Sequence, residues 1–256
     1  MTMDDVEIIG WDGKPLRCDR CAYRSLHDDG RCRAGRSCAN DRYAPRVDRF
    51  VRDNPERAGE LLRHPYFEVR AVAARHAEPG RLPWMMRDPD ETVRAVVALR
   101  ISQKLLGRLS RDPHREVRIR VATRVDGAEL VGMAQDDDYF VRVLVARRLP
   151  VQMLGILMED TDREVRRTVA SRLPPDELPA MAGDPDAGVR VEVARRIPSG
   201  WLGSLRDDPD WRVRYEIVQR LDRNRLKTMI DDPDELVREL VKTRLAEEPH
   251  IWRESA

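Results

Sequence analysis

Four cysteine side chains lie close enough in the sequence to act on one centre, and they are the residues best suited to chemistry. They are Cys18, Cys21, Cys32 and Cys38, in the spacing C-x2-C-x10-C-x5-C, and no cysteine occurs in the 218 residues that follow. The first eleven residues are acidic and short of apolar side chains, so we expect neither a secretion signal nor a membrane span. We therefore expect a cytoplasmic protein, in which clustered thiols favour a metal site over disulfides.

The spacing of these thiols leaves two occupants open. The C-x2-C pair lets two thiolates converge on one centre, while Gly30 and Gly35 supply the tight bends needed to bring in the others. A structural tetrahedral Zn²⁺ and an iron–sulfur cluster both suit four thiolates. The C-x5-C half departs from the paired C-x2-C of a zinc ribbon, which weakens the case for zinc without excluding it. Four free cysteines are the remaining, less favoured alternative.

Basic side chains surround the cysteines. Between Asp12 and Arg49, ten Lys or Arg residues outnumber six Asp residues, an excess of four positive charges. The ten are Lys14, Arg17, Arg20, Arg24, Arg31, Arg33, Arg36, Arg42, Arg46 and Arg49. Either four-thiolate centre is anionic, so these groups can neutralise it and lower the pKa values of the thiols. A nucleic-acid-binding patch is the alternative explanation, although few aromatic side chains are present for stacking.

The rest of the chain is built from a 24-residue repeat. A Val-Arg pair recurs at that interval without a slip across eight copies. The valines are Val69, Val93, Val117, Val141, Val165, Val189, Val213 and Val237. Asp stands five residues before the valine in seven copies, with His64 in the first, and Leu stands thirteen residues after it in seven copies. A fixed period of this length is the signature of a solenoid.

Each repeat should contain one α-helix and a shorter helical return. Asp88 followed by Pro89 predicts a helix start, because the carboxylate accepts from free N–H groups and proline at the first helical position loses no bond. We expect a helix of about 11–12 residues, from near Pro89 to near Arg100. The return carries Leu-x-x-Leu or Leu-x-x-Met, which in so short a segment predicts one or two helical turns, 3₁₀ turns among them. A β-strand is disfavoured because the residues do not alternate with period two.

The arginine after each repeated valine lies inside the apolar arc of the predicted helix. In one copy this arc contains Val189, Val193, Ala194 and Ile197, and Arg190 falls within it. A buried guanidinium must be paired and hydrogen-bonded, and the only equally persistent acid is the Asp six residues earlier. We therefore predict an Asp–Arg ladder that ties repeat to repeat. An arginine that extends to solvent from the edge of the stripe is the alternative.

Composition and repeat pattern together predict the domain organisation. The 256 residues have a net charge of +1, 36% charged residues and 5% aromatic residues, which is typical of a thin solenoid with few deep core positions. We expect a four-cysteine module over residues 1–45, a partial capping repeat over 46–63, about eight repeats over 64–245 and a C-terminal tail or cap over 246–256. His64 and His76 replace Asp and Arg at repeat positions of the first unit, and we expect them to be edge substitutions rather than ligands.

This combination of motifs resembles a known family. A 24-residue repeat rich in Leu and Val, with Asp-Pro and Val-Arg, joined to an N-terminal four-cysteine cluster, resembles the leucine-rich repeat variant (LRV) proteins over essentially the whole chain. The resemblance implies an all-α, right-handed superhelical solenoid, in which α-helices alternate with short 3₁₀-helices and which the cysteine module caps. It also implies a [4Fe-4S] cluster on Cys18, Cys21, Cys32 and Cys38, with zinc as the alternative. Ordinary leucine-rich repeats are excluded because their L-x-x-L-x-L strand is missing, and 24 residues are too few for the two full helices of a HEAT-type repeat.

No catalytic motif accompanies the cysteines. The sequence contains no Gly-rich phosphate loop, no G-x-S-x-G and no H-E-x-x-H, and its five histidines are scattered. We therefore expect a non-catalytic interaction scaffold that binds a protein partner, with the cluster structural or redox-sensing. A nucleic-acid-binding solenoid and an electron-transfer protein are the alternatives. Near-zero net charge weighs against the first, and the lack of a second cofactor motif weighs against the second.

Overall fold

The computed structural model describes residues 6–247, and they form a solenoid of helices. Within this range no β-strand is present, and the only sheet-like pairings are two isolated bridges, Gly10 with Asp41 and Arg33 with Ser37. The prediction of an all-α solenoid of α-helices alternating with short helices is therefore confirmed. The chain divides into an N-terminal unit that ends at Met133 and a C-terminal unit that begins at Ala134.

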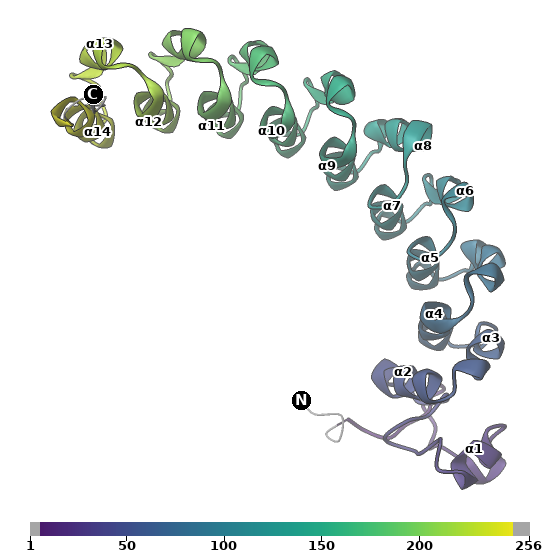
Figure 1. Ribbon diagram of the computed structural model, residues 1–256. Coiled ribbons are helices and arrows are strands. Elements are labelled where there is room, and N and C mark those ends of the chain that lie inside the picture. The colour runs from purple at the N-terminus through teal and green to yellow at the C-terminus, as the bar shows by residue number, and fades with distance from the viewer. Residues whose placement is uncertain (1–5, 248–256) are drawn as a thin grey trace, which may run out of the picture. The chain divides into compact units, whose positions relative to one another are not determined.

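The N-terminal unit contains the cysteine segment and the first repeats. Its elements are η2 (Cys18–Arg20), α1 (Arg24–Asp28), α2 (Ala44–Asp53), η3 (Pro55–Arg57), α3 (Ala58–Leu61), α4 (Phe67–His76), η4 (Pro79–Arg81), η5 (Pro83–Arg87), α5 (Glu91–Ala98), α6 (Gln103–Leu106), η6 (Gly107–Leu109), α7 (Arg115–Ala122) and α8 (Gly127–Gly132). Helix α2 packs on α4, α4 on α5, and α5 on α7. The α-helices that open the repeats therefore form one row, as Figure 1 shows.

The C-terminal unit repeats the same arrangement. Its elements are α9 (Tyr139–Arg148), η8 (Val151–Leu157), α10 (Arg163–Arg172), η9 (Pro175–Met181), α11 (Ala187–Arg196), η10 (Ser199–Leu205), α12 (Trp211–Arg220), α13 (Arg223–Leu226), η11 (Lys227–Met229) and α14 (Glu235–Ala246), with η7 (Met133–Gln135) at the division between the units. Helices α9, α10, α11, α12 and α14 pack in that order. Of the predicted C-terminal tail, Ala246 ends α14, and residues 248–256 lie outside the described range.

Each repeat helix begins two residues later than the sequence predicted. In α4 and α7 the N-cap is Tyr66 or His114, without a side-chain hydrogen bond. In the other repeat helices the N-cap is an Asp, as in Asp90, which has an extended backbone and accepts from the Thr92 N–H at 2.8 Å. Asp138, Asp162, Asp186, Asp210 and Asp234 cap their helices in the same way. The expected cap, Asp88, is instead occupied by the Asp90 N–H at 3.0 Å and by Arg70 of the preceding repeat. The Asp-Pro step is therefore a turn before the helix, and most of the helices are ten residues long.

The second segment of each repeat is a short helix, as predicted, and its type follows the residue that opens it. Where Pro150, Pro174 or Pro198 precedes this segment, the segment is a 3₁₀-helix of seven residues. Where Ser102 or Asp222 precedes it, the segment begins with a four-residue α-helix and ends in a 3₁₀ turn. Asp222 accepts from two N–H groups of the following turn, which favours the α-helical start.

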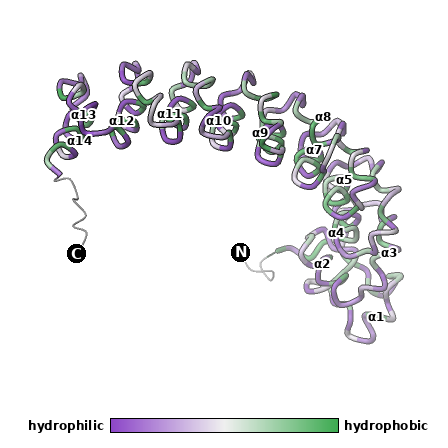
Figure 2. The backbone as a smooth tube through the Cα atoms, turned by 45° about the horizontal axis from the view of Figure 1, so that its top comes forward, coloured by the Kyte–Doolittle hydropathy of each residue, from purple (hydrophilic) through white to green (hydrophobic). Residues whose placement is uncertain are grey.

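The core is a narrow layer between the two rows of helices. All eight repeated valines are fully buried, and so are the leucines that follow them by thirteen residues. Figure 2 shows hydrophilic and hydrophobic residues mixed along the helices. In α10, α11 and α12 the buried residues lie on one face of the helix. None of the helices within residues 6–247 is long and apolar enough to span a bilayer.

The predicted Asp–Arg ladder is present, with a partner that the sequence did not identify. The side chain of Arg166 is 11% exposed, and its Nε and Nη2 donate to the two carboxylate oxygens of Asp184 at 2.7 and 2.9 Å. The same two-bond pair joins Arg70 to Asp88, Arg94 to Asp112, Arg142 to Asp160, Arg190 to Asp208 and Arg214 to Asp232. The residue six positions before each Arg, which is His64 in the first repeat and Asp in the others, contributes its backbone carbonyl instead, as Asp160 does to Arg166 at 2.8 Å.

A second series of arginines also joins the repeats, and it was not predicted. Seven residues after each repeated valine stands Arg100, Arg124, Arg148, Arg172, Arg196, Arg220 or Arg244, with His76 in the first repeat. Arg196 is typical: its guanidinium donates to the carbonyls of Ala170 and Leu173, at the C-terminal end of the preceding helix, at 2.6 and 2.8 Å. Helix C-termini leave carbonyls without partners, so within each unit this series caps a helix from the next repeat.

Candidate metal centre

The first two cysteines are placed by a single helical turn. Cys18 opens η2, and the Cys21 N–H donates to the Cys18 carbonyl at 3.4 Å. The Cys21 carbonyl then accepts a hydrogen bond of 3.1 Å from the N–H of Arg24, the first residue of α1. The C-x2-C spacing therefore lies across one short turn, as the sequence analysis required for two converging thiols. Both side chains are partly exposed.

Two glycines bring the other cysteines back toward this turn. Gly30 and Gly35 have φ values of +74° and +76°, a region that L-residues with side chains rarely adopt. After the first bend, the Cys32 N–H donates to the Leu26 carbonyl at 3.0 Å, and after the second, the Cys38 N–H donates to the Arg46 carbonyl at 3.2 Å. The predicted role of the two glycines is confirmed. Both Cys32 and Cys38 are buried.

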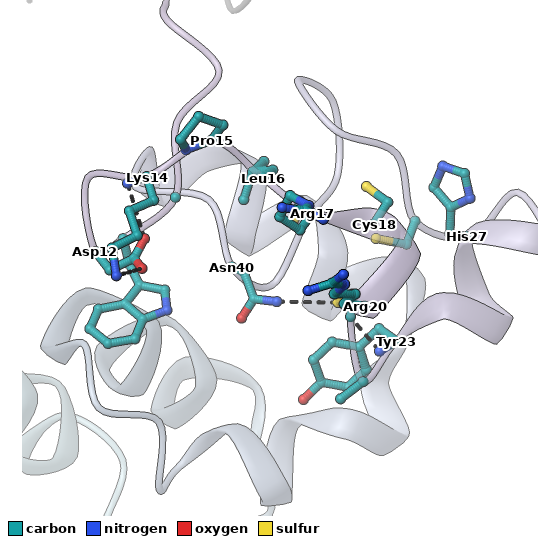
Figure 3. Close-up of a pocket in the computed structure, with 16 residues that line it drawn as sticks. Asp12, Lys14, Pro15, Leu16, Arg17, Cys18, Arg20, Tyr23, His27 and Asn40 are labelled. Carbon is teal, nitrogen blue, oxygen red and sulfur yellow. Dashed lines mark hydrogen bonds and ion pairs between the residues drawn. The ribbon is translucent and has the colours of Figure 1, made fainter.

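All four thiols line one cavity of ≈ 350 Å³. Its other walls include Trp11, Lys14, Tyr23, His27 and Asn40, and several of these are drawn around Cys18 in Figure 3. Among the described residues, no three His, Cys, Asp or Glu side chains are arranged around a point that a single metal ion could occupy. Thiolates are the ligands that both iron–sulfur clusters and zinc accept, so the donor set at this cavity fits the group that the sequence implied.

The thiols influence one another strongly. Burial raises the pKa of Cys18, and the charges of Cys38 and Cys21 add to the increase. A hydrogen bond between Cys32 and Cys38 raises the pKa of Cys38 and lowers that of Cys32. Several thiolates close together in this cavity therefore disfavour one another unless a cation is bound.

The sulfur of Cys21 accepts two hydrogen bonds. The Tyr23 N–H lies 3.4 Å from Sγ, and Nδ2 of Asn40 lies 3.3 Å from it. In Figure 3 a dashed line marks the hydrogen bond that the Asn40 amide nitrogen donates. Asn40 also forms a backbone hydrogen bond with Cys38, so one residue is bonded to two of the four thiols. Sequence reasoning missed Asn40, because an asparagine two residues after a cysteine carries no metal-ligand signal.

Few of the ten basic residues counted in the sequence lie at the cavity. Lys14, Arg17 and Arg20 line it, and both arginines are paired with Asp19, at 3.3 and 3.7 Å. Arg31 instead binds Glu56 at 2.7 Å. The positive residues at the cavity are therefore partly neutralised, and others of the ten serve to hold the segment together.

The cysteine segment is attached to the first helix pair of the solenoid. The Tyr23 and Phe50 rings lie 5.1 Å apart, and Nδ2 of Asn54 donates to the Arg31 carbonyl at 3.1 Å. Arg46 of α2 stands 24 residues before Arg70, at the ladder position, and is buried to 1% exposure. It binds Asp41 at 3.3 Å and the Glu7 and Val6 carbonyls rather than the residue 18 positions ahead, which is His64. Sequence analysis missed this ladder position because Pro45 breaks the Val-Arg pair.

The two histidines at the junction, His64 and His76, hold repeat positions. Nε2 of His76, at a position where the other repeats have the capping arginine, lies 2.8 Å from a carboxylate oxygen of Asp48 in α2. His64 stands at the ladder-acid position and makes its contacts with Asn40, Tyr66 and Trp11. Neither lines the cavity that contains the thiols. His27 does line it, although its spacing from the cysteines gave no reason to single it out.

Comparisons with known proteins agree with this geometry. Residues 8–60 match the family model described as LRV protein FeS4 cluster, and residues 163–186 match the leucine rich repeat variant model. A curated relative from Rhodobacter capsulatus, described as an uncharacterized 27.7 kDa protein in the nifB 3′ region, is 47% identical over 95 residues, which cover 37% of this chain. That match spans only 39% of the relative's own length.

A solved structure extends the similarity to nearly the whole chain. It is described as a leucine-rich repeat variant with a novel repetitive protein structural motif, and it is 41% identical in sequence. The alignment covers 90% of this chain and 99% of that one, with a TM-score of 0.86. The chain therefore belongs to the leucine-rich repeat variant family, as an LRV repeat protein that carries the FeS4 cluster domain.

Proposed function

We propose that this chain is a non-catalytic interaction scaffold whose iron–sulfur cluster, of the [4Fe-4S] type, is structural or redox-sensing. The ligands would be Cys18, Cys21, Cys32 and Cys38. The observation that supports this most directly is that all four thiols line one cavity, where a single polynuclear group could bind them. When bound, such a cluster supplies a one-electron redox centre.

The hydrogen bonds and ion pairs of the polar side chains support a role without catalysis. Arg and Asp are the abundant side chains that could act in catalysis, and those of the ladder and of the capping series are bound to each other or to helix ends. Their pKa values follow from this pairing: the Asp184 carboxylate raises the pKa of Arg166, with burial opposing it. Groups held in this way stabilise the packing of neighbouring repeats rather than activate a substrate.

Exposed aromatic side chains in the C-terminal unit support a protein partner. Tyr139 and Trp211 are the first residues of α9 and α12, so they lie at the same edge of the row of helices, and both are exposed. Trp201 in η10 is 53% exposed. Tyr and Trp are enriched at the centres of protein interfaces, where they contribute much of the binding energy.

Anaerobic purification tests the nature of the centre. We expect brown protein that contains iron and sulfide in equal amounts, with a broad visible absorption that bleaches on chemical reduction or exposure to air. Colourless protein with stoichiometric zinc would contradict the proposal. Mössbauer spectra of protein enriched in ⁵⁷Fe would then identify the type of cluster.

Affinity capture from native extract, prepared anaerobically, tests the scaffold role. Wild-type bait is compared with a Tyr139→Ala, Trp211→Ala double variant, which should lose a protein that the wild type retains. If the cluster is a sensor, the affinity for that protein should differ between oxidised and reduced bait by a coupling of about 1–3 kcal/mol. Equal affinity for oxidised, reduced and cluster-free bait would leave only the structural role.

A further inference from the structure

A column of equivalent residues runs from the repeats into the cysteine segment. Asn40, His64 and Asp88 are spaced by 24 residues, so Asn40 and His64 hold the position that Asp holds in every later repeat. In those repeats this Asp binds the arginine of the preceding repeat and the N–H two residues ahead. His64 keeps only the second bond, in which the Tyr66 N–H donates to Nδ1 at 3.1 Å.

This bond determines how the rest of the column is oriented. Because Nδ1 accepts from Tyr66, the hydrogen of the neutral imidazole resides on Nε2, which lies 3.4 Å from Oδ1 of Asn40. Burial lowers the pKa of His64, which favours the neutral ring. With its oxygen occupied in this way, Asn40 must direct its NH₂ group toward Sγ of Cys21, at 3.3 Å.

We propose that His64 and Asn40 form a hydrogen-bond relay that sets the reduction potential of the cluster held by Cys21 and couples it to the first repeat. Asn40 is the direct donor to the ligand sulfur, and His64 is the positioning residue that fixes the orientation of the amide. This inference rests on the proposed function, because it requires a redox-active cluster at the cavity.

The chemistry of the column explains why the repeat residue is replaced here. An aspartate in place of His64 would offer only acceptors, so the Asn40 amide would turn its NH₂ group toward that carboxylate and its oxygen toward the sulfur. Two partial negative charges would then face each other at Cys21. Trp11 packs edge-on against the His64 ring, with centroids 5.4 Å apart, and this limits the access of water that could bond in place of Asn40.

The expected consequence is a higher reduction potential. Reduction adds one electron to the cluster and makes its sulfur ligands more negative, so an N–H donor at the sulfur stabilises the reduced state more than the oxidised state. Removing the donor should therefore shift the reduction equilibrium toward the oxidised state. We expect a shift of about tenfold, equivalent to about 59 mV for a one-electron couple.

The test uses neutral substitutions in the full chain, loaded with its cluster and titrated anaerobically with a one-electron chemical reductant. Asn40→Leu removes the donor, and His64→Leu removes the residue that positions it. His64→Gln is the rescue, since its amide can donate to Asn40 in place of Nε2. Asp112→Asn is the matched control: it weakens the ladder pair with Arg94 in the same column without touching the cysteine segment.

The relay predicts a lower potential in both leucine variants, a potential close to wild type in His64→Gln, and a lower melting temperature with an unchanged potential in Asp112→Asn. Unchanged potentials in the two leucine variants would overturn the relay alone, as would an equal shift in Asp112→Asn, which would indicate general loosening. If Asn40→Leu fails to retain the cluster, His64→Leu, in which Asn40 is intact, decides the outcome. Wild-type protein without iron and sulfide would overturn the proposed function itself.

Discussion

Arg166 and Asp184 form two parallel hydrogen bonds, 2.7 and 2.9 Å long, between neighbouring repeats. The pair joins the helix of one repeat to the turn that precedes the helix of the next. A guanidinium matches a carboxylate in this planar geometry, and a lysine ammonium does not. Because the pair recurs at the same position of successive repeats, it fixes the distance and the rotation between neighbouring repeats in the same way each time.

We predict that Arg166→Leu destabilises the protein by about 3–5 kcal/mol, the range for breaking a buried ion pair. The substitution leaves the Asp184 carboxylate, 5% exposed, without its guanidinium. Denaturant unfolding measures the loss. Since solenoid stability is roughly a sum over neighbouring interfaces, hydrogen exchange should become faster in α10 and α11 before it does elsewhere.

Arg163→Leu is the matched control in the same helix. The Arg163 side chain is 67% exposed, and its nearest carboxylate oxygen, on Asp186, is 3.6 Å away. Surface pairs of this kind contribute little, so we expect a change within about 0.5 kcal/mol. Small and equal losses for the two variants would show that the ladder does not hold the repeats together.

The sequence predicted the ladder but not its partner, for a physical reason. The helical wheel places Arg166 on the buried face of its own helix, which shows that it needs an acid. It contains no information on which repeat faces that side chain, so the nearest acid in the sequence, Asp160, was assigned although Asp184 is the partner. The same limit applies to Asn40, whose contact with Cys21 depends on how a loop closes in space.

Two other features of the repeats, the N-cap and the capping arginines, have partners that the sequence pattern does not identify. Asp88 precedes a proline, which predicts an N-cap there, yet Asp90 caps the helix because the Asp88 carboxylate already accepts from Arg70. The capping arginines, such as Arg196, recur as regularly as the ladder. Positive residues near a helix C-terminus are common for electrostatic reasons alone, so their regularity does not by itself predict a hydrogen bond to the preceding helix.

Arg196→Met should destabilise the protein by about 1–3 kcal/mol, because the Ala170 and Leu173 carbonyls at the end of α10 lose their donors. Methionine keeps most of the apolar stem of the side chain, so the loss reports the hydrogen bonds. Thermal and denaturant unfolding measure it. Arg167→Met, at a side chain that is 52% exposed, serves as the control and should change the unfolding free energy by less than about 0.5 kcal/mol.

The pH dependence of stability should reveal the ladder carboxylate Asp232. Burial acts to raise its pKa, but hydrogen bonds from Arg214 and from the Asp234 N–H, together with the charges of Arg214 and Arg238, hold it below the ordinary value of 3.8. A lowered folded-state pKa means that this stabilisation is fully present above the unfolded-state pKa. It is lost as the pH falls through the folded-state pKa.

Asp232→Asn should therefore cost about 1–3 kcal/mol at neutral pH, and its difference from wild type should shrink as the pH falls below about 4. Unfolding free energies measured by urea denaturation at a series of pH values give both quantities. Asp231→Asn changes the neighbouring exposed carboxylate and should have little effect at any pH. A difference between Asp232→Asn and wild type that stays constant to low pH would mean that charge pairing at Asp232 contributes nothing.

Cys38→Ala should abolish the cluster while the repeats keep their structure. The Cys38 side chain is buried, and its removal takes away one of four thiol ligands. The contacts that attach the segment to the solenoid are made by other atoms, such as the Tyr23 and Phe50 rings and the Arg31–Glu56 pair, so helices α4 to α14 should be unaffected. We expect loss of iron, sulfide and visible absorption, together with a far-ultraviolet circular dichroism spectrum close to that of wild type. Ser37→Ala, at the preceding residue, is the control: it removes a hydroxyl that contacts Asp53 at 3.3 Å and should keep the cluster.

Loss of most of the helical signal in Cys38→Ala would instead show that the cysteine segment is part of the solenoid's folding unit. The first repeats would then depend on a metal-bound cap for their stability.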